Sequence, residues 1–465
     1  MELVIAGGKV VDERGVRRAD VLVRGGRIAA VAPPSPGARR AARHALDARG
    51  CLILPGVVDP HVHLALPIGP GLRTADDFAS GTRAAAAGGV TTLVDYTTPG
   101  PDQAPLDALR ARRALADGRA HVDYGLHNVL IGWRPGLRAE LARLVGLGAP
   151  SVKLFTIYRD RGWQADDGRL LEVMQAARAL GVTVCVHAES DALIELFTRR
   201  ALSLPASRRP GALALALARP PLVEHEAVAR VILLAGFAGA RLHLVHLSTA
   251  AAARAVGQAR AAGLPVSGET CPQYLALASR ALSGPHGHRL GCCPPLRAPE
   301  EARGLQEALR RGWLQALATD HCAFTSAQKD QWGGDFRRIP YGLPGLETAL
   351  RLTYTLGPAA RALPLARWVA LHTAGPARLF GLYPRKGSLE PGADADLVVF
   401  DPAARQRLRA ADLETPLDWS PYEGRELRGA VRHVLLRGRE IAREGRCLDA
   451  PARGRFLRRS PASPA

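Results

Sequence analysis

The strongest constraint on the fold is an alternation of short apolar runs with Ala-, Leu- and Arg-rich helical segments between about residues 52 and 385. Such an alternation is typical of parallel strands that are connected by helices. Eight runs are predicted to be strands: 52–58, 90–96, 121–131, 150–155, 182–187, 241–247, 264–269 and 314–319. Eight βα units predict an α/β chain with a (β/α)8 TIM-like barrel.

The segments on either side of the barrel are also strand-like. Residues 1–51 contain short alternating runs with Gly-Gly turns, and residues 387–450 contain ADADLVVF and VRHVLLRG. We predict that 1–51 and 387–450 pair into one small β-sandwich domain, beside a barrel at 52–386. The tail 451–465, which is basic and then Ser/Pro-rich, is predicted to be mobile or held by a neighbouring subunit.

Composition restricts the class of protein. Apolar residues make up 47% of the 465 residues and charged residues 23%, a balance that supports a large core in water. The sequence contains no uninterrupted apolar run of membrane-spanning length and no basic segment ahead of an apolar one, so neither a membrane partner nor a secretion signal is expected. Seven cysteines, without a CxxC pair, disfavour a disulfide framework and favour the cytoplasm.

A formal net charge of +19 raises the question of a nucleic-acid partner. Only four of the 62 basic residues are lysines, and the arginines are spread over every segment. Aromatic residues make up 5% of the chain and do not alternate with the basic ones as stacking platforms would. We therefore expect no nucleic-acid partner.

Potential metal ligands gather where the predicted strands end, which is where barrel enzymes carry their catalytic residues. His61 and His63 follow Asp59 at the end of the first strand, and a period of two places both imidazoles on one face. Asp59 is a candidate partner behind them. Three further strands end in potential ligands: His187, His246 and Asp320. Imidazole and carboxylate groups together form a set that suits zinc.

Three other histidines are expected to be structural. His243 lies three residues before His246, so a regular pleat would point the two rings to opposite faces. His127 and His321 lack the position or parity of a ligand at the strand ends.

Lys153 lies in the apolar run SVKLF, although this chain otherwise prefers arginine. A buried ammonium group is costly, which indicates that a primary amine is needed there. A neutral lysine amine can take up carbon dioxide, and the resulting carbamate can bridge two cations. The alternative is a lysine whose amine reaches solvent.

Nine ordered motifs resemble the hydantoinase/dihydropyrimidinase group of cyclic amidohydrolases, and the resemblance runs from about residue 2 to 458. The motifs are LPGVVDPHVHL (54–64), TADDFASGT (74–82), GGVTTLVDY (88–96), SVKLFTIY (151–158), VHAES (186–190), VHLS (245–248), GETCPQYL (268–275), CCPPLR (292–297) and TDHCAF (319–324).

The resemblance implies a hydrolase with two divalent metal ions per subunit, with zinc expected. His61, His63 and Asp320 would hold one ion and His187 and His246 the other, with Lys153 bridging them as N6-carboxylysine. The implied reaction opens the cyclic ureide ring of dihydropyrimidines or 5-substituted hydantoins to N-carbamoyl amino acids. In that reaction Asp320 would transfer the proton, and Tyr158 would hydrogen-bond the developing oxyanion. A homo-oligomer, a tetramer or a dimer, is also implied.

The chain departs from the family pattern at the substrate. Cys293 stands where a serine is usual before PPLR, and Tyr341 stands where an asparagine is usual. In the family these two positions hold the ring largely through backbone groups, so we expect ring recognition to persist. Tyr341 and the apolar loop 65–73 are expected to change the space around the exocyclic group.

Three alternatives are weighed against this interpretation. A dihydroorotase-like enzyme typically has an arginine two residues after the HxH motif, where this chain has Ala65. An allantoinase-like enzyme usually reads DHSPC where this chain reads DHCAF. A non-catalytic scaffold is disfavoured because all six ligand positions are intact.

Overall fold

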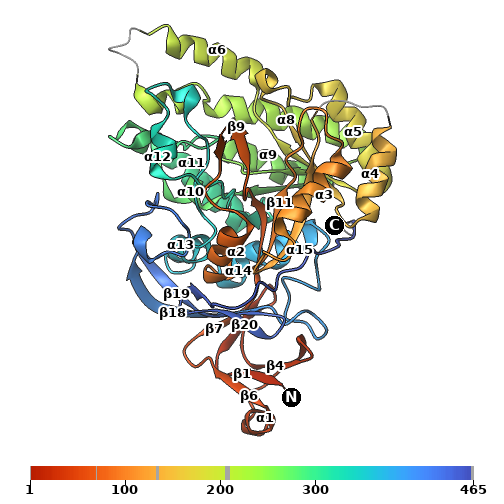
Figure 1. Ribbon diagram of the computed structural model, residues 1–465, viewed down its shortest axis with the longest axis vertical. Helices are drawn as coiled ribbons and strands as arrows, with labels where there is room; N and C mark the ends of the chain where they lie inside the picture. Colours follow the sequence, from red (N-terminus) through yellow and green to blue (C-terminus); the bar gives the residue numbers. More distant parts are fainter. Residues whose placement is uncertain (1, 70, 132–135, 205–209, 462–465) are drawn as a thin grey trace.

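The computed structural model describes residues 2–69, 71–131, 136–204 and 210–461. Its largest sheet has eight parallel strands in the order β17-β16-β15-β14-β13-β12-β11-β8. The strands are β8 (Val57–Val62), β11 (Val90–Tyr96), β12 (Asp123–Val129), β13 (Ser151–Phe155), β14 (Thr183–His187), β15 (Arg241–Leu244), β16 (Val266–Thr270) and β17 (Ala316–Leu317). Thr319, just after β17, donates its backbone N–H and its hydroxyl to Asp59 in β8, which draws the two edge strands together. The sheet therefore curves into a barrel (Figure 1).

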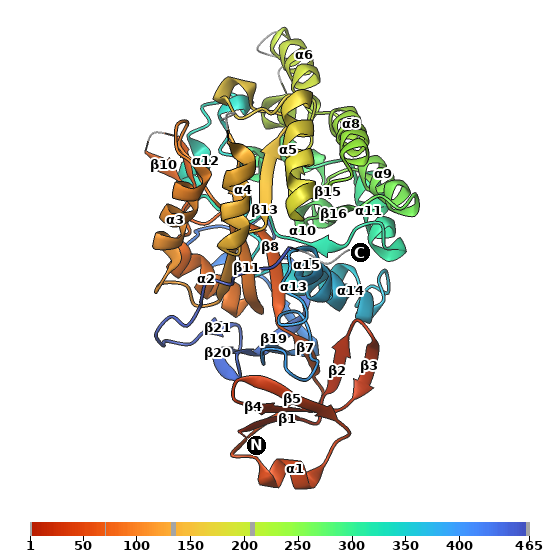
Figure 2. The same ribbon diagram turned by 90° about the vertical axis from the view of Figure 1, so that its right-hand side faces the viewer.

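Helices surround the barrel, as Figure 2 shows for α4, α5, α8 and α9. The helices between strands are α2 (Phe78–Ala87), α3 (Pro105–Ala116), α4 (Leu137–Gly146), α5 (Asp167–Leu180), α6 (Asp191–Leu202), α7 (Ala214–Leu217), α8 (Pro221–Ala238), α9 (Ala250–Ala261), α10 (Pro272–Ala276) and α11 (Pro299–Arg311). After β17 come α12 (Ser326–Asp330), α13 (Ala349–Leu356), α14 (Leu365–His372) and α15 (Ala374–Leu379). Among the described helices, none combines the length and hydropathy that a membrane crossing requires. The predicted barrel is confirmed.

Both ends of the chain build the second part of the fold. A seven-stranded sheet has the order β21-β20-β19-β18-β7-β2-β3, and a four-stranded sheet has the order β5-β4-β1-β6. The N-terminal strands are β1 (Leu3–Ala6), β2 (Lys9–Asp12), β3 (Gly15–Arg18), β4 (Asp20–Arg24), β5 (Arg27–Ala32), β6 (His44–Asp47) and β7 (Leu52–Pro55), with the short α1 (Pro36–Ala41) before β6. The C-terminal strands are β18 (Leu397–Arg407), β19 (Glu426–Leu436), β20 (Arg439–Arg443) and β21 (Arg446–Cys447).

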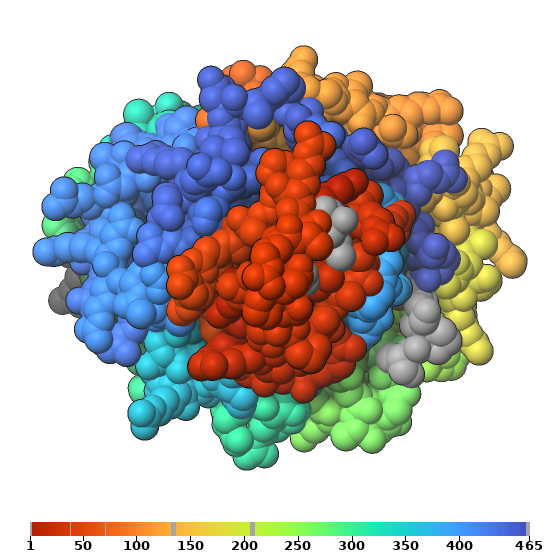
Figure 3. Space-filling view, turned by 90° about the horizontal axis from the view of Figure 1, so that it is seen from below, coloured from red at the N-terminus to blue at the C-terminus, as the bar shows by residue number. Residues whose placement is uncertain are grey.

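One apolar core joins these two sheets. It combines Ile5 and Val21 of the four-stranded sheet with Val10, Leu397 and Val399 of the seven-stranded sheet. Viewed from the end away from the barrel, the N-terminal residues lie in front of the C-terminal ones (Figure 3). The predicted β-sandwich of both chain ends is confirmed.

The prediction of one continuous strand at 52–58 is wrong, because the structure divides this segment between β7 and β8. β7 pairs with β18 and β2 in the seven-stranded sheet, whereas β8 begins the barrel. Gly56 separates them at a point where an added Cβ atom would lie 2.1 Å from Thr91 Oγ1. The division into 1–51 with 387–450, 52–386 and 451–465 stays a prediction, and the pairing of β7 favours a first boundary near Gly56.

The described part of the tail packs on its own chain, contrary to the prediction that the tail is mobile or held by a neighbour. Leu457 donates its backbone N–H to Tyr124 O, and Arg459 N donates to Gly148 O. The Arg459 guanidinium is buried and donates to Ser151 Oγ at 2.8 Å. An arginine that satisfies buried acceptors fixes this segment beneath β12 and β13.

Candidate active site

All nine predicted site residues line one cavity at the carboxyl ends of the barrel strands. The cavity has a volume of about 200 Å³. Those residues are His61, His63, Lys153, Tyr158, His187, His246, Cys293, Asp320 and Tyr341. The closing of the barrel brings them together from the three strands β8, β13 and β14 and from loops that follow the barrel strands.

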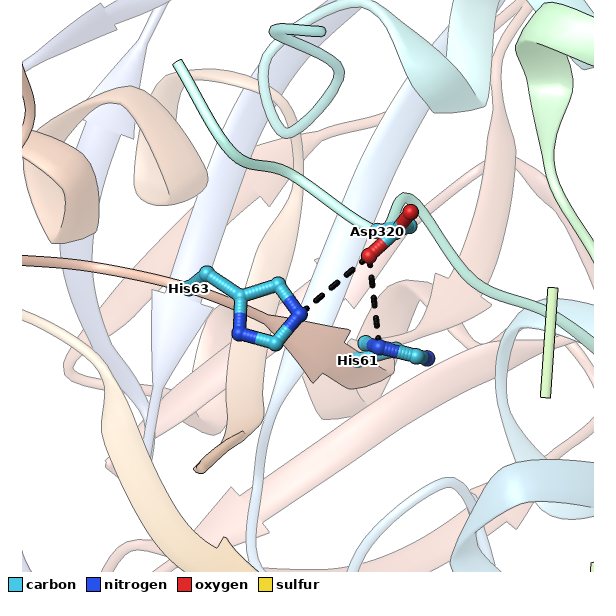
Figure 4. A group of neighbouring side chains, drawn as sticks. All are labelled: His61, His63 and Asp320. Atoms are coloured by element: carbon cyan, nitrogen blue, oxygen red, sulfur yellow. Dashed lines mark ion pairs between the residues drawn. The ribbon is translucent and has the colours of Figure 1, made fainter. Parts of the chain in front are cut away.

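His61, His63 and Asp320 form one half of the site (Figure 4). Asp320 Oδ1 lies 3.2 Å from His61 Nε2 and 3.3 Å from His63 Nε2. Burial lowers the pKa of His61 to about 4, so its ring is neutral near pH 7 and retains a lone pair. Apart from Asp320, His61 Nε2 has no hydrogen-bond partner among the described residues. Two imidazoles that converge on a carboxylate fit a divalent cation.

Glu269, at the end of β16, holds this half in place, and the sequence analysis assigned it no role. Its Oε1 lies 2.5 Å from His61 Nδ1, and its Oε2 lies 3.1 Å from His243 Nε2. A carboxylate on Nδ1 directs Nε2 of His61 toward the cavity. Asp59 does not have the predicted position behind the His61 ring, because it accepts the backbone N–H of His61 at 3.1 Å. Glu269 was present in the motif GETCPQYL, but its contact with His61 spans more than 200 residues.

His187 and His246 form the other half, with ring centroids 4.4 Å apart. Burial lowers the pKa of both rings, which keeps them neutral near pH 7. Glu189 Oε2 lies 2.8 Å from His187 Nε2 and 2.7 Å from Arg219 Nη1. The His187 ring is therefore oriented by a buried carboxylate that is itself held by an arginine.

His243 is structural, as predicted, but not for the predicted reason. β15 ends at Leu244, and His246 has a φ of 40°, so the pleat does not continue to His246. The buried His243 ring instead contacts Ser267 and Glu269 below the cavity. His127 and His321 also stay outside the cavity, bonded to Ser151 and Asp76 respectively.

Lys153 reaches the cavity from β13 and is 2% exposed. Its Nζ lies 5.1 Å from the Tyr96 ring centroid and 5.3 Å from that of Phe155. Burial lowers the pKa of Lys153 to about 8, which makes its neutral amine accessible. Over the described residues, no hydrogen bond or ion pair engages Nζ. The amine is therefore available for chemistry inside the cavity.

Four of the seven described non-glycine residues with positive φ lie in the cavity wall or next to it. Tyr158, His246 and Asp320 have φ values of 69°, 40° and 49°, and Ala65 has a φ of 46°. Positive φ at a non-glycine residue costs roughly 1–3 kcal/mol and is typical of functional sites. The fold accepts this cost to direct three of the predicted side chains into the cavity.

One wall of the cavity joins Tyr158, Cys293 and Tyr341. The Tyr158 hydroxyl lies 3.3 Å from Cys293 Sγ, and Arg219 Nη1 donates to the same sulfur at 3.0 Å. The Tyr341 hydroxyl donates to Phe336 O at 3.2 Å, while its ring faces the cavity. The cavity is also lined by Leu66, Pro67 and Ile68 of loop 65–73. This loop contributes β9 (Pro67–Gly69) and β10 (Leu72–Arg73).

Tyr96 is a further lining residue that the sequence analysis missed. Its ring centroid lies 4.6 Å from that of His61 and 5.0 Å from that of His63. It belongs to the motif GGVTTLVDY, where an aromatic residue at the end of an apolar strand looks like ordinary core. The packed ring limits the rotation of both histidines.

Residues 52–441 match the family model described as the amidohydrolase family. The chain is 39% identical to the D-hydantoinase of Streptomyces coelicolor and 36% identical to that of Geobacillus stearothermophilus, in both cases over at least 97% of each chain. The structure resembles the dihydropyrimidinase of Brevibacillus agri with a TM-score of 0.94, 35% identity and full coverage of both chains. It resembles the L-hydantoinase of Arthrobacter aurescens with a TM-score of 0.90 and 30% identity, over 98% of this chain and 100% of the other. The chain therefore belongs to the amidohydrolase family, in its hydantoinase/dihydropyrimidinase group.

Proposed function

We propose that this cyclic amidohydrolase opens the ring of dihydropyrimidines or 5-substituted hydantoins, giving N-carbamoyl amino acids. The observation that carries the proposal is the single cavity in which six potential metal ligands meet Tyr158. The bond cleaved is a carbon–nitrogen bond of a cyclic amide, which accords with the names of the relatives. A hydrolysis screen of dihydrouracil, dihydrothymine, 5-substituted hydantoins and allantoin with zinc-loaded protein tests it. Failure to open any of these rings would contradict it.

The proposed function uses two divalent ions, and we assign zinc. His61, His63 and Asp320 would hold one ion, His187 and His246 would hold the other, and Lys153, carboxylated at Nζ, would be a ligand shared by both. The neutral rings of His61, His187 and His246, the free amine of Lys153 and the carboxylate of Asp320 support this assignment. When bound, the ions activate water and polarise the ring carbonyl. Potential ligand atoms of His187, Glu189 and Cys293 also lie within 4.8 Å of one another. Because Glu189 is engaged by Arg219, we propose that Glu189 orients the His187 ring and is not a metal ligand.

Asp320 is proposed to move the proton. Burial opposes its ionisation, but the neighbouring histidines outweigh burial and hold the pKa of Asp320 below its usual value. The carboxylate is therefore ionised near pH 7 and can accept a proton from the attacking water. It then delivers this proton to the leaving ring nitrogen.

Tyr158 is proposed to donate a hydrogen bond to the carbonyl oxygen as negative charge develops there. Burial raises the pKa of Tyr158 well above its usual value, so the hydroxyl keeps its proton. Its present partner, the Cys293 sulfur, is a weak acceptor. A substrate oxygen can therefore replace that sulfur at little cost.

Tyr341 and Cys293 are proposed to contact the substrate and to set its preferred size. Tyr341→Asn removes an aromatic ring from the wall, so we expect the ratio of kcat/KM for dihydrouracil to that for 5-aryl hydantoins to change. An unchanged ratio would show that Tyr341 does not contact the substituent.

We propose that the chain is a cytoplasmic homo-oligomer, a tetramer or a dimer. All seven cysteines are free, which accords with a reducing compartment. Leu222, Leu233 and Phe237 share one face of α8 and are 54%, 74% and 77% exposed, an apolar surface that suits a second copy. In light scattering, Leu233→Glu with Phe237→Glu is expected to lower the molar mass. An unchanged mass would exclude α8 from the interface.

A further inference from the structure

Lys329 is a fully buried lysine outside the proposed metal site. It lies in α12 and is 0% exposed. Its Nζ donates to three backbone carbonyl oxygens: Gly291 O at 2.8 Å, Pro340 O at 2.5 Å and Gly342 O at 2.7 Å. A lysine ammonium group has three N–H donors, and here each has an acceptor. The residue therefore joins two segments that are about 50 positions apart in the sequence.

The two segments that Lys329 joins form walls of the active-site cavity. Gly291 stands two residues before Cys293, and Pro340 and Gly342 flank Tyr341. Cys293, Tyr341 and Gly342 all line the cavity. Gly342 N also donates to Gly291 O at 3.0 Å, which is a direct link between the segments. Lys329 therefore lies behind the wall that contains Cys293 and Tyr341, the two residues that depart from the family pattern.

The chemistry of the amine explains why a lysine stands here in an arginine-rich chain. Burial is costly for an ammonium at this position and lowers the pKa of Lys329 to about 7, but the three carbonyl oxygens favour the protonated form, which alone supplies one N–H to each. No carboxylate among the described residues pairs with it. An apolar side chain would avoid the cost if packing were the only requirement. Arginine cannot replace lysine, because its planar, forked donors do not converge on three carbonyl oxygens around a point.

We propose that Lys329 is a positioning residue, whose ammonium group fixes the 291–293 and 340–342 segments at the separation that the substrate ring requires. Lys329 does not touch the reacting atoms and acts through the backbone of the two segments. Its loss should weaken binding of the ring in the ground state and in the transition state alike. This effect appears in KM more than in kcat, since the metal ligands stay in place. The inference rests on the proposed function, because KM is measured on a cyclic ureide.

Two variants and a matched control test the proposal. Lys329→Met retains the length of the side chain without its donors, and Lys329→Arg retains the charge with a different geometry. The control is Arg367→Met, because Arg367 also donates to two backbone carbonyls, Leu309 O and Leu314 O, at the other end of the barrel. Zinc content, thermal midpoint, kcat and KM are measured for each variant. Hydrogen–deuterium exchange is followed in peptides that cover 286–296 and 337–346.

We expect both Lys329 variants to bind wild-type amounts of zinc and to exchange faster in both peptides. We expect KM to rise about tenfold or more with a smaller change in kcat, whereas Arg367→Met shows neither effect. Unchanged exchange in both Lys329 variants would refute the link between the segments. Faster exchange with an unchanged KM would make Lys329 a structural residue only. If the wild-type protein opened no ring, the proposed function would fail, while the exchange measurement would still decide whether Lys329 joins the segments.

Discussion

Replacing Glu269 with glutamine tests how the site holds its first metal ion. The carboxylate lies 2.5 Å from His61 Nδ1 and 3.1 Å from His243 Nε2, and it is buried. Glutamine has the same shape but no charge, so the hydrogen bond to His61 becomes a neutral one. Bonds to charged groups contribute roughly 1.5–3 kcal/mol and neutral ones roughly 0.5–1.5 kcal/mol, so about 1–2 kcal/mol is lost.

This loss should appear as weaker metal binding at His61. A cost of about 1–2 kcal/mol corresponds to a decrease of roughly 5- to 30-fold in affinity, which overlaps the range of roughly 10- to 100-fold that is typical when partners of metal ligands are replaced. Zinc content is measured by elemental analysis during titration with a chelator. We expect Glu269→Gln to lose one of its two ions at lower chelator concentrations than the wild-type protein.

A matched control separates this effect from a general loss of stability. Glu224 is also buried and accepts hydrogen bonds from the backbone and side chain of Ser248, but it contacts no proposed metal ligand. Glu224→Gln should therefore retain both ions. Equal zinc affinity in Glu269→Gln and the wild-type protein would refute the role assigned to Glu269.

The remaining predictions concern catalysis, the bridging lysine and pH. Asp320→Asn should lower kcat at least ~10²-fold while some metal is retained, and Tyr158→Phe should lower kcat comparably with both ions bound; near-normal rates would contradict these roles. Lys153→Arg should abolish two-metal binding, because a guanidinium group does not form the carbamate. Millimolar acetate or propionate should partly restore activity to Lys153→Ala. An unmodified amine at Lys153 in a density map of the active, metal-loaded enzyme would exclude the carbamate. Burial raises the pKa of Glu347 from 4.5 to about 8, so its contribution favours the folded state at low pH and is lost as pH rises toward 8. Glu347→Gln should therefore raise the thermal midpoint relative to wild type by an amount that grows from pH 5 to pH 9, and a constant difference would refute this.

The sequence by itself determined the features that depend on local spacing. The alternation of strands and helices indicated the barrel, because the spacing of apolar side chains that marks a strand or a helix lies within that one element and does not depend on distant contacts. Period two at His61 and His63 placed both rings on one face, and the lysine in an apolar strand marked Lys153. Each of these signals lies within a few neighbouring residues.

Only the tertiary structure decided which distant groups meet. Glu269 contacts His61, and Lys329 joins two segments, because the closed barrel and its loops bring these residues together. The break at Gly56 and the docking of Arg459 depend on contacts with Thr91 and Ser151, and no local pattern records such contacts. The proposed metal ligands lie at or just after the ends of strands, a position that the local sequence pattern indicates. The residues that orient those ligands come from other elements. The sequence therefore indicated the proposed ligands, whereas only the tertiary structure showed which residues hold those ligands in position.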